Sequence, residues 1–273
     1  MIGTWMTCGR AILAAAALGL VALGAPQASA DVLAPAVKRL GAASPTHVLF
    51  VGNSYFYYND SLHNHVRRMV AAAGLQTEKA MKYKSATIGG AALFDHPLDH
   101  YLEPGKLRVK GPFQVVVLQG GSAAPLSDER RGKFSETVRD FAGKIMAAGG
   151  EVALYMTHGY VPPHKKARAD MIRDIETLYV EAGNAVGGLV IPVGLAFEEA
   201  YRRRPEIVLH QSHDGSHPSL LGTYLAASVV FYSLYGQTPV GNAYDYFGKV
   251  PAEDVRFLQE VAADTVEAFY ARQ

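Results

Sequence analysis

Residues His47-Val-Leu-Phe-Val51, followed directly by Gly52-Asn53-Ser54, carry the clearest structural signal in this chain. Five consecutive apolar or β-prone residues are typical of a strand buried on both faces of a parallel sheet. The glycine then lets the backbone turn sharply, which places a serine just past the carboxyl end of the strand. In open parallel sheets, ligands bind where the carboxyl ends of strands meet the amino ends of helices. The stretch therefore predicts an α/β fold with Ser54 at its functional edge.

Extended stretches and helical patterns alternate along the rest of the chain. Expected strands span residues 78–88, 113–118, 151–156 and 189–193. Expected helices run from Asn59, Asp60 or Ser61 to Gly74, over 128–147, through Ile172–Ala182, and over 196–203, 220–235 and 251–270. Alternation at this spacing is typical of βα units, whose crossovers make neighbouring strands parallel. The sequence thus predicts a mostly parallel five-stranded sheet with helices on both faces.

The first thirty residues have the layout of a secretory signal peptide. Arg10 precedes an apolar run from Ala11 to Leu23, and Ala28-Ser-Ala30 supplies small residues for cleavage after Ala30. The apolar run is short for a membrane span, although an uncleaved anchor is the alternative interpretation. The sequence therefore predicts a secreted or periplasmic protein without stable membrane insertion after signal cleavage.

The mature chain is expected to form one domain with no net charge. Residues 31–45 are predicted to be a lead-in segment, and residues 46–273 a single domain. The sequence has 26 basic and 25 acidic residues, and residues 1–30 contain one arginine and no acid. The remaining charges balance, which argues against nucleic acid as a partner. The one cysteine, Cys8, would leave with the signal peptide, so the mature protein would have no disulfide.

Asp214 and His217 are the best candidates for an acid–base pair. They lie three residues apart in the loop Gln211–Pro218, close enough for the carboxylate to meet one imidazole nitrogen. The other nitrogen would then face outward and accept a proton from a serine. In the alternative interpretation, Asp214 caps the following helix and His217 lies on the surface. His213 also adjoins Asp214, but neighbouring side chains generally diverge, which favours His217.

Backbone and side-chain donors for an oxyanion hole follow three of the expected strands. The N–H of Ser54 is one, and Gly89 or Gly90 after the second strand supplies another. After the third strand, Gln119 carries an amide and Ser122 a hydroxyl, and residue type alone does not choose between them. Because parallel strands gather their carboxyl ends at one edge, these donors are expected to converge there.

Two rival sites are less well supported by the sequence. Ser122 lies in Gly120-Gly-Ser-Ala-Ala124, which approaches the Gly-x-Ser-x-Gly elbow of α/β-hydrolases, but that fold takes its Asp and His from separate loops. Several histidines invite a metal site, namely His63, His65, His96, His100, His210, His213 and His217. They lie in different segments, and no His-Glu-x-x-His motif is present. We therefore expect Ser54 as nucleophile, with no metal and no cofactor.

Four blocks of the chain resemble those of the SGNH (GDSL-like) hydrolase superfamily. The blocks are Gly52-Asn-Ser54, Ile88-Gly-Gly90, Leu118-Gln-Gly-Gly-Ser122 and Asp214-Gly-Ser-His-Pro218. The resemblance implies a flavodoxin-like three-layer α/β/α sandwich, with Ser54, His217 and Asp214 as a catalytic triad. It also implies that a second-block glycine and a third-block residue help to form the oxyanion hole. Two departures mark a divergent branch: Asn53 replaces the usual Asp, and the third block lacks Gly-x-Asn.

The expected function is that of a secreted serine esterase acting on acyl or acetyl esters of small molecules or carbohydrates. It would form an acyl-enzyme on Ser54. The aromatic run Tyr55-Phe-Tyr-Tyr58 beside it either lines an acyl or sugar pocket or packs in the core. Because two blocks are altered, a non-catalytic glycan- or small-ligand-binding domain on the same fold is the alternative.

Overall fold

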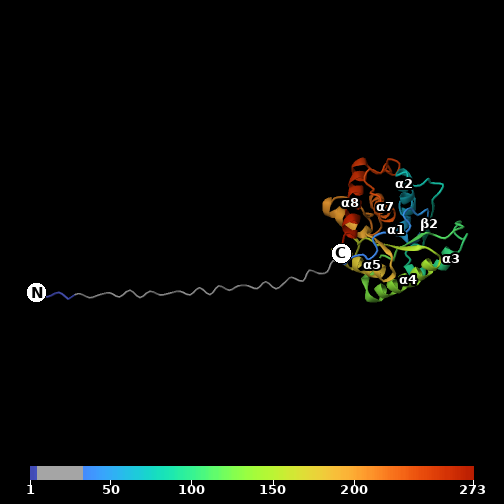
Figure 1. Ribbon diagram of the computed structural model, residues 1–273. Helices are drawn as coiled ribbons and strands as arrows, with labels where there is room; N and C mark the ends of the chain where they lie inside the picture. Colours follow the sequence, from blue (N-terminus) through green and yellow to red (C-terminus); the bar gives the residue numbers. More distant parts are fainter. Residues whose placement is uncertain (5–32) are drawn as a thin grey trace. The chain divides into compact units, whose positions relative to one another are not determined.

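The computed structural model describes residues 1–4 and 33–273, and residues 33–273 form a compact unit (Figure 1). The predicted signal peptide, its cleavage after Ala30 and Cys8 lie outside the described residues. Within the described part of the chain, no helix is both long enough and apolar enough to cross a membrane.

Five parallel strands form the central sheet in the order β2-β1-β3-β4-β5. Their bounds are β1 His47–Gly52, β2 Lys82–Thr87, β3 Val115–Leu118, β4 Glu151–Tyr155 and β5 Leu189–Ile191. The Val-Val-Val-Leu run of β3 is buried at every position, as expected of a central strand covered on both faces. This sheet confirms the predicted fold class, and every strand pair within the described chain is parallel.

Helices cover both faces of the sheet (Figure 1). The α-helices are α1 Ser54–Tyr57, α2 Leu62–Ala72, α3 Leu98–Leu102, α4 Asp128–Ala147, α5 Met171–Val186, α6 Val193–Arg203, α7 Leu220–Tyr235 and α8 Ala252–Tyr270. Two short 3₁₀ turns are η1 Leu93–Asp95 and η2 Ala124–Leu126. One apolar core holds α2, α6, α7 and α8 against the sheet, and the other holds α3, α4 and α5. The result is a three-layer α/β/α sandwich.

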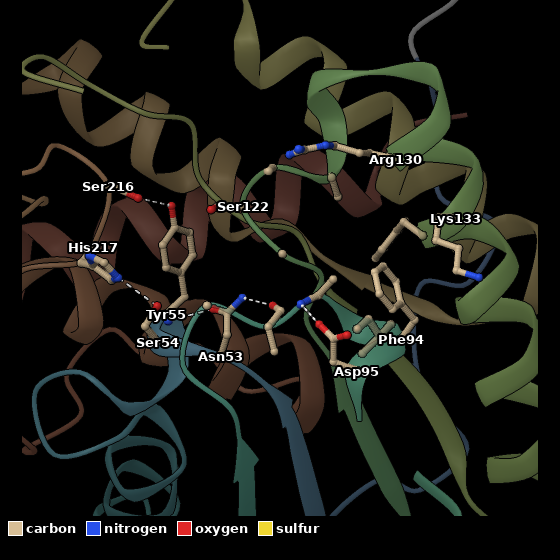
Figure 2. Close-up of a pocket in the computed structure, with 18 of the residues that line it drawn as sticks. Asn53, Ser54, Tyr55, Phe94, Asp95, Ser122, Arg130, Lys133, Ser216 and His217 are labelled. Carbon is tan, nitrogen blue, oxygen red and sulfur yellow. Dashed lines mark hydrogen bonds between the residues drawn. The ribbon is translucent and has the colours of Figure 1, made fainter. Parts of the chain in front are cut away.

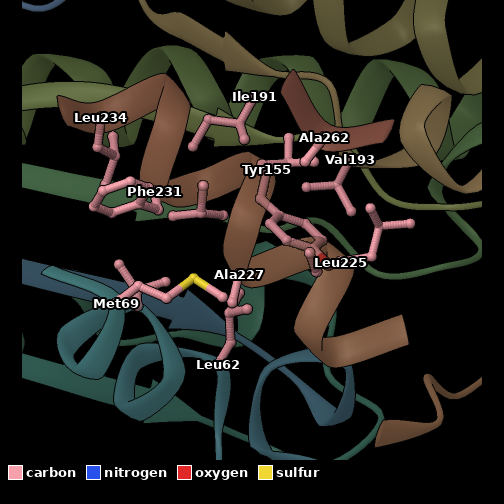
Figure 3. Close-up of a cluster of buried hydrophobic side chains, with 14 of the residues drawn as sticks. Leu62, Met69, Tyr155, Ile191, Val193, Leu225, Ala227, Phe231, Leu234 and Ala262 are labelled. Atoms are coloured by element: carbon pink, nitrogen blue, oxygen red, sulfur yellow. The ribbon is translucent and has the colours of Figure 1, made fainter. Parts of the chain in front are cut away.

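Helix α7 is buried on nearly all sides because it is apolar all round. Its side chains pack among those of α2, α8 and the sheet; Phe231, Leu234 and Ala227 lie beside Met69 and Ile191 in the same cluster (Figure 3). A helix that is hydrophobic on every face belongs in a protein interior. This packing fixes the amino end of α7, which directly follows the loop carrying Asp214 and His217.

Strand register brings the predicted site residues to one edge of the sheet. Val51 of β1 pairs with Ala86 of β2 and with Leu118 of β3. The segments that follow these strands, which begin near Ser54, Gly89 and Gln119, therefore leave the sheet side by side. That edge is the place where open α/β sheets bind ligands.

Candidate active site

The turn that carries Ser54 is tightly packed. A Cβ at Gly52 would lie 2.5 Å from Oε1 of Gln119 and 2.9 Å from the ring of Phe56, so these two side chains leave room only for a glycine. Asn53 caps α1, accepting a hydrogen bond from the N–H of Tyr55 (3.1 Å). Its Nδ2 donates to the carbonyl of Ala91 (3.0 Å), which ties this turn to the segment after β2. Ser54 is the first residue of α1 and is only 7% exposed.

Ser54, His217 and Asp214 form one chain of hydrogen bonds. Nε2 of His217 lies 2.9 Å from Oγ of Ser54, and its Nδ1 lies 2.5 Å from Oδ2 of Asp214 (Figure 2 shows the first of these bonds). Because the carboxylate only accepts, Nδ1 carries the proton and Nε2 accepts from the serine hydroxyl. Residues separated by 163 positions thus meet in the arrangement that proton removal from a serine requires.

The other carboxylate oxygen of Asp214 is held by its own loop. Oδ1 accepts hydrogen bonds from the N–H groups of Ser216 (2.8 Å) and His217 (3.0 Å). Partial burial raises the pKa of Asp214, but the hydrogen bonds from the His217 ring and these two backbone groups outweigh it and lower the pKa to about 2. The carboxylate is therefore ionised and fixed in orientation. His213 lies 3.5 Å from the same carboxylate with its side chain 69% exposed, on the solvent side.

The residues expected to donate to an oxyanion differ in their surroundings. Gly90 lines the cavity beside Ser54 with φ of +72°. Gly89 lies against the hydroxyl of Tyr57. Both amide atoms of Gln119 are engaged by backbone: Oε1 accepts from the N–H of Asn53 (3.0 Å), and Nε2 donates to the carbonyl of Gly120.

Ser122, the other third-block candidate, lies in the cavity lining. Its Oγ is 2.9 Å from the hydroxyl of Tyr160. The Tyr160 O–H donates in this bond, and Ser122 also faces the hydroxyl of Tyr55. Of the two side-chain donors that the sequence left open, Ser122 is the one that lines the cavity.

A cavity of about 580 Å³ opens beside Ser54 and His217, within the range typical of small-molecule sites. In Figure 2, Tyr55, Ser216 and His217 lie at one end, and Phe94, Arg130 and Lys133 at the other. Small residues of 90–92 and 121–124 form much of the wall near the serine. The far end combines an aromatic ring with charges of both signs, because Asp95 and Glu129 also line it.

The four aromatic residues after Ser54 lie in different environments. Tyr55 and Phe56 are buried, whereas Tyr57 is 42% exposed. The ring of Tyr58 stacks on that of His217, with centroids 4.4 Å apart and planes 14° apart. Tyr58 thus shields one face of the imidazole, a contact that nothing in the sequence pattern indicated.

Most of the remaining histidines bond to the backbone or pack against aromatic rings. His65 contacts the carbonyl of Asn59 (2.6 Å), and His210 contacts that of Gly159 (3.0 Å). Burial lowers the pKa of both. Among residues 1–4 and 33–273, no cluster of three or more His, Cys, Asp or Glu side chains is arranged to hold a metal ion.

Several solved structures are similar to this chain in fold. A DUF4886 family protein from Bacteroides uniformis matches with a TM-score of 0.63 and 18% identity, over 83% of this chain and 95% of its own. A Slackia heliotrinireducens protein provisionally designated an SGNH hydrolase matches with a TM-score of 0.54 and 22% identity, over 69% and 98% of the chains. The acetyl xylan esterase AlAXEase matches with a TM-score of 0.53 and 18% identity, over 68% and 98%.

Neither a protein-family model nor a curated protein matches the sequence. The structural likeness shows that residues 33–273 have the fold of the SGNH hydrolases, as their four sequence blocks predicted. Because one fold hosts many functions, the activity has to be argued from the site itself.

Proposed function

We propose that this chain, which has the SGNH-hydrolase fold, is a serine esterase. The observation that supports this most directly is the hydrogen-bonded chain Ser54–His217–Asp214 beside the cavity. His217 Nε2 removes the Ser54 proton as Oγ attacks the ester carbonyl carbon. Asp214 holds the imidazole in the required tautomer and stabilises its protonated form. The protonated His217 then gives its proton to the departing alcohol.

Hydrolysis of the acyl-enzyme uses the same residues. His217 takes a proton from a water molecule, the resulting hydroxide attacks the acyl carbon, and the Ser54 oxygen leaves with the proton. We assign the oxyanion hole to the N–H groups of Ser54 and Gly90 and the hydroxyl of Ser122. Loss of one such donor costs roughly 100-fold or more in kcat. The engaged amide of Gln119 favours a positioning role for that residue.

The cavity favours a polar ester over a long acyl chain. Its lining combines the apolar side chains of Leu93, Phe94 and Phe134 with four charged ones, whereas a fatty acyl chain needs a continuous apolar wall. An acetylated carbohydrate or a small polar ester fits this lining. We therefore expect kcat/KM to fall as the acyl chain of 4-nitrophenyl esters is lengthened beyond a few carbons, measured on the purified protein.

The decisive experiment is a comparison of the parent with Ser54→Ala. We expect the parent to hydrolyse 4-nitrophenyl acetate and to be labelled by a fluorophosphonate at neutral pH. Ser54→Ala should lose at least about a thousandfold in kcat and should not be labelled, while its melting temperature stays within a few degrees. Equal hydrolysis by both proteins would exclude Ser54 as nucleophile. A folded parent that neither reacts with the probe nor turns over esters would instead favour the non-catalytic ligand-binding alternative.

We further propose that residues 1–30 direct export and are removed after Ala30. The support is the sequence pattern of that segment. Amino-terminal sequencing of the protein recovered outside the cytoplasm should begin at Asp31. A mature protein that retains residues 1–30 would indicate the uncleaved anchor instead.

A further inference from the structure

His158 lies beneath the site, between two aromatic rings. It lies three residues past the end of β4 and is 1% exposed. Its ring stacks on Tyr55 on one side (4.4 Å between centroids, 9° between planes) and on Phe197 of α6 on the other (4.3 Å, 6°). Tyr55 is the residue that follows Ser54. The three stacked rings therefore join the turn of the nucleophile to the segment after β4 and to α6.

The hydrogen bonds of His158 define its protonation. Nε2 lies 2.9 Å from the carbonyl oxygen of Ser216, and a carbonyl only accepts, so Nε2 carries the proton. Nδ1 is buried and has no hydrogen-bond partner among the described residues. Burial lowers the pKa of His158 well below its ordinary value, and the neighbouring His210 lowers it further. The ring is a neutral donor with one fixed tautomer.

Ser216 is held at three points. Its carbonyl accepts from His158, its hydroxyl lies 2.9 Å from that of Tyr55, and its N–H donates to Asp214. It lies directly before His217 in the chain. Two of these three contacts come from the stacked pair Tyr55–His158, which thereby connects the loop of the acid–base pair to the turn of the nucleophile.

We propose that His158 is a positioning residue that sets the distance between Ser54 and His217 by holding the Ser216 carbonyl and the Tyr55 ring together. This inference rests on the proposed esterase function. His158 does not line the cavity, so it acts through Ser216 and Tyr55. Removal of its N–H should misplace the His217 ring, while the cavity walls formed by residues 90–95 and 121–124 stay in place. The effect should appear in kcat, with KM little changed.

The test compares three variants of the full mature chain. His158→Phe keeps a stacking ring and removes the donor, whereas His158→Gln keeps an N–H at a position equivalent to Nε2. The control is His65→Phe, because His65 is equally buried and also bonds to a backbone carbonyl, but it lies on α2. Each is measured for kcat and KM on 4-nitrophenyl acetate and for melting temperature. NMR follows the imidazole N–H proton of His217 that bonds to Asp214.

We expect His158→Phe to lower kcat at least tenfold with KM within about twofold, and to shift or broaden the His217 resonance. His158→Gln should recover part of the activity. His65→Phe should lower the melting temperature by a similar amount but keep kcat and the resonance. If His158→Phe loses no more kcat than His65→Phe and retains the parent resonance, His158 is a packing residue only. An inactive parent would instead contradict the proposed esterase, and the resonance alone would then decide whether His158 positions His217.

Discussion

Asn53 uses both ends of its side-chain amide, and this explains why it differs from the usual Asp of the resembled superfamily. Its oxygen accepts from the N–H of Tyr55, and its nitrogen donates to the carbonyl of Ala91. A carboxylate could make the first bond only, because it has no proton to donate. In this chain the amide therefore connects the nucleophile turn to the Gly90 segment.

Asn53→Asp would restore the common motif and should nevertheless impair the protein. A buried carboxylate would face the Ala91 carbonyl oxygen, and losing a buried hydrogen bond costs about 1–3 kcal/mol. We expect the free energy of unfolding to fall by that amount and kcat on 4-nitrophenyl acetate to fall several-fold. Denaturant titration and steady-state kinetics measure both quantities. Unchanged or higher activity would show that the link to Ala91 does not matter for the site.

The ionised carboxylate of Asp214 makes a pH-dependent contribution to stability. Its pKa is about 2 in the folded protein, below the ordinary value of about 3.9. A group whose pKa is lowered by folding stabilises the fold above its unfolded-state pKa, and this stabilisation disappears as the pH falls through the folded-state pKa. Between pH 5 and pH 2, the free energy of unfolding should therefore decrease less in Asp214→Asn than in the parent, by at most about 2 kcal/mol.

Glu199 supplies the matched control for this measurement. Its hydrogen bond from Arg202, together with that from Arg203, outweighs partial burial and lowers its pKa to about 2 as well, yet it lies on α6 outside the cavity lining. In Glu199→Gln, the free energy of unfolding should likewise decrease less than in the parent between pH 5 and pH 2, while the variant keeps full activity. Asp214→Asn should lose about a thousandfold or more in kcat. Coincident acid-unfolding curves for the parent and Asp214→Asn would contradict the assigned pKa.

The sequence predicts contacts in the site between residues that are close together in the chain. It does not predict contacts between residues that are far apart in the chain. Asp214 and His217 are three residues apart, so their contact is readable from the chain. The engagement of Gln119 depends on Asn53, 66 positions away, and that of His158 depends on Ser216, 58 positions away. No periodicity or motif encodes such pairings. The roles assigned to the site residues stay predictions until the variants are measured.

Secondary-structure elements followed the sequence best where helical periodicity was long. The helices expected over 128–147 and 220–235 have those bounds in the structure. The strand expected over 189–193 ends at Ile191, because Pro192 cannot continue the ladder and instead precedes α6. The four-residue helix α1 escaped prediction because it is too short to show a period. Ser61 is the residue before α2, but it makes no side-chain cap.

The loop between α6 and α7 needs a glycine at residue 215 for two reasons. Gly215 has φ of +62°, and a Cβ there would overlap the backbone carbonyl of Val161. Gly187, which ends α5, has the same φ but nothing within 4 Å of its Cβ position. Comparing alanine at the two positions separates backbone strain from steric overlap.

Gly187→Ala should cost about 1–2 kcal/mol for the left-handed conformation alone and leave kcat unchanged. Gly215→Ala should cost more, because the loop must move away from Val161. Since that loop carries Asp214 and His217, kcat should fall at least tenfold. Thermal unfolding and ester hydrolysis measured on both variants test this. Equal costs and equal activities would show that the loop adapts without displacing His217.

Residues 33–45 of the lead-in segment are hydrogen-bonded to the elements that follow, although their sequence shows no period. The side chain of Asn184 of α5 makes two hydrogen bonds to this segment. It donates to the carbonyl of Ala34 (3.0 Å) and accepts from the N–H of Ala36 (2.7 Å). Glu151 at the start of β4 accepts from the N–H groups of Gly41 and Ala42, each at 2.7 Å. These bonds join the segment to both ends of the β4–α5 unit.

Two truncations test how far the domain extends. A chain starting at Leu33 keeps the four bonds described above. It should have the same unfolding temperature and the same activity as a chain starting at Asp31. A chain starting at residue 46 loses these bonds and the burial of Leu40, which is 7% exposed. It also leaves the Glu151 carboxylate without its backbone donors. We expect the second truncation to lower the free energy of unfolding by about 2–5 kcal/mol while the active site still reacts with a fluorophosphonate at low temperature. Equal stability of the two truncated chains would place the boundary of the domain at residue 46, as the sequence alone suggested.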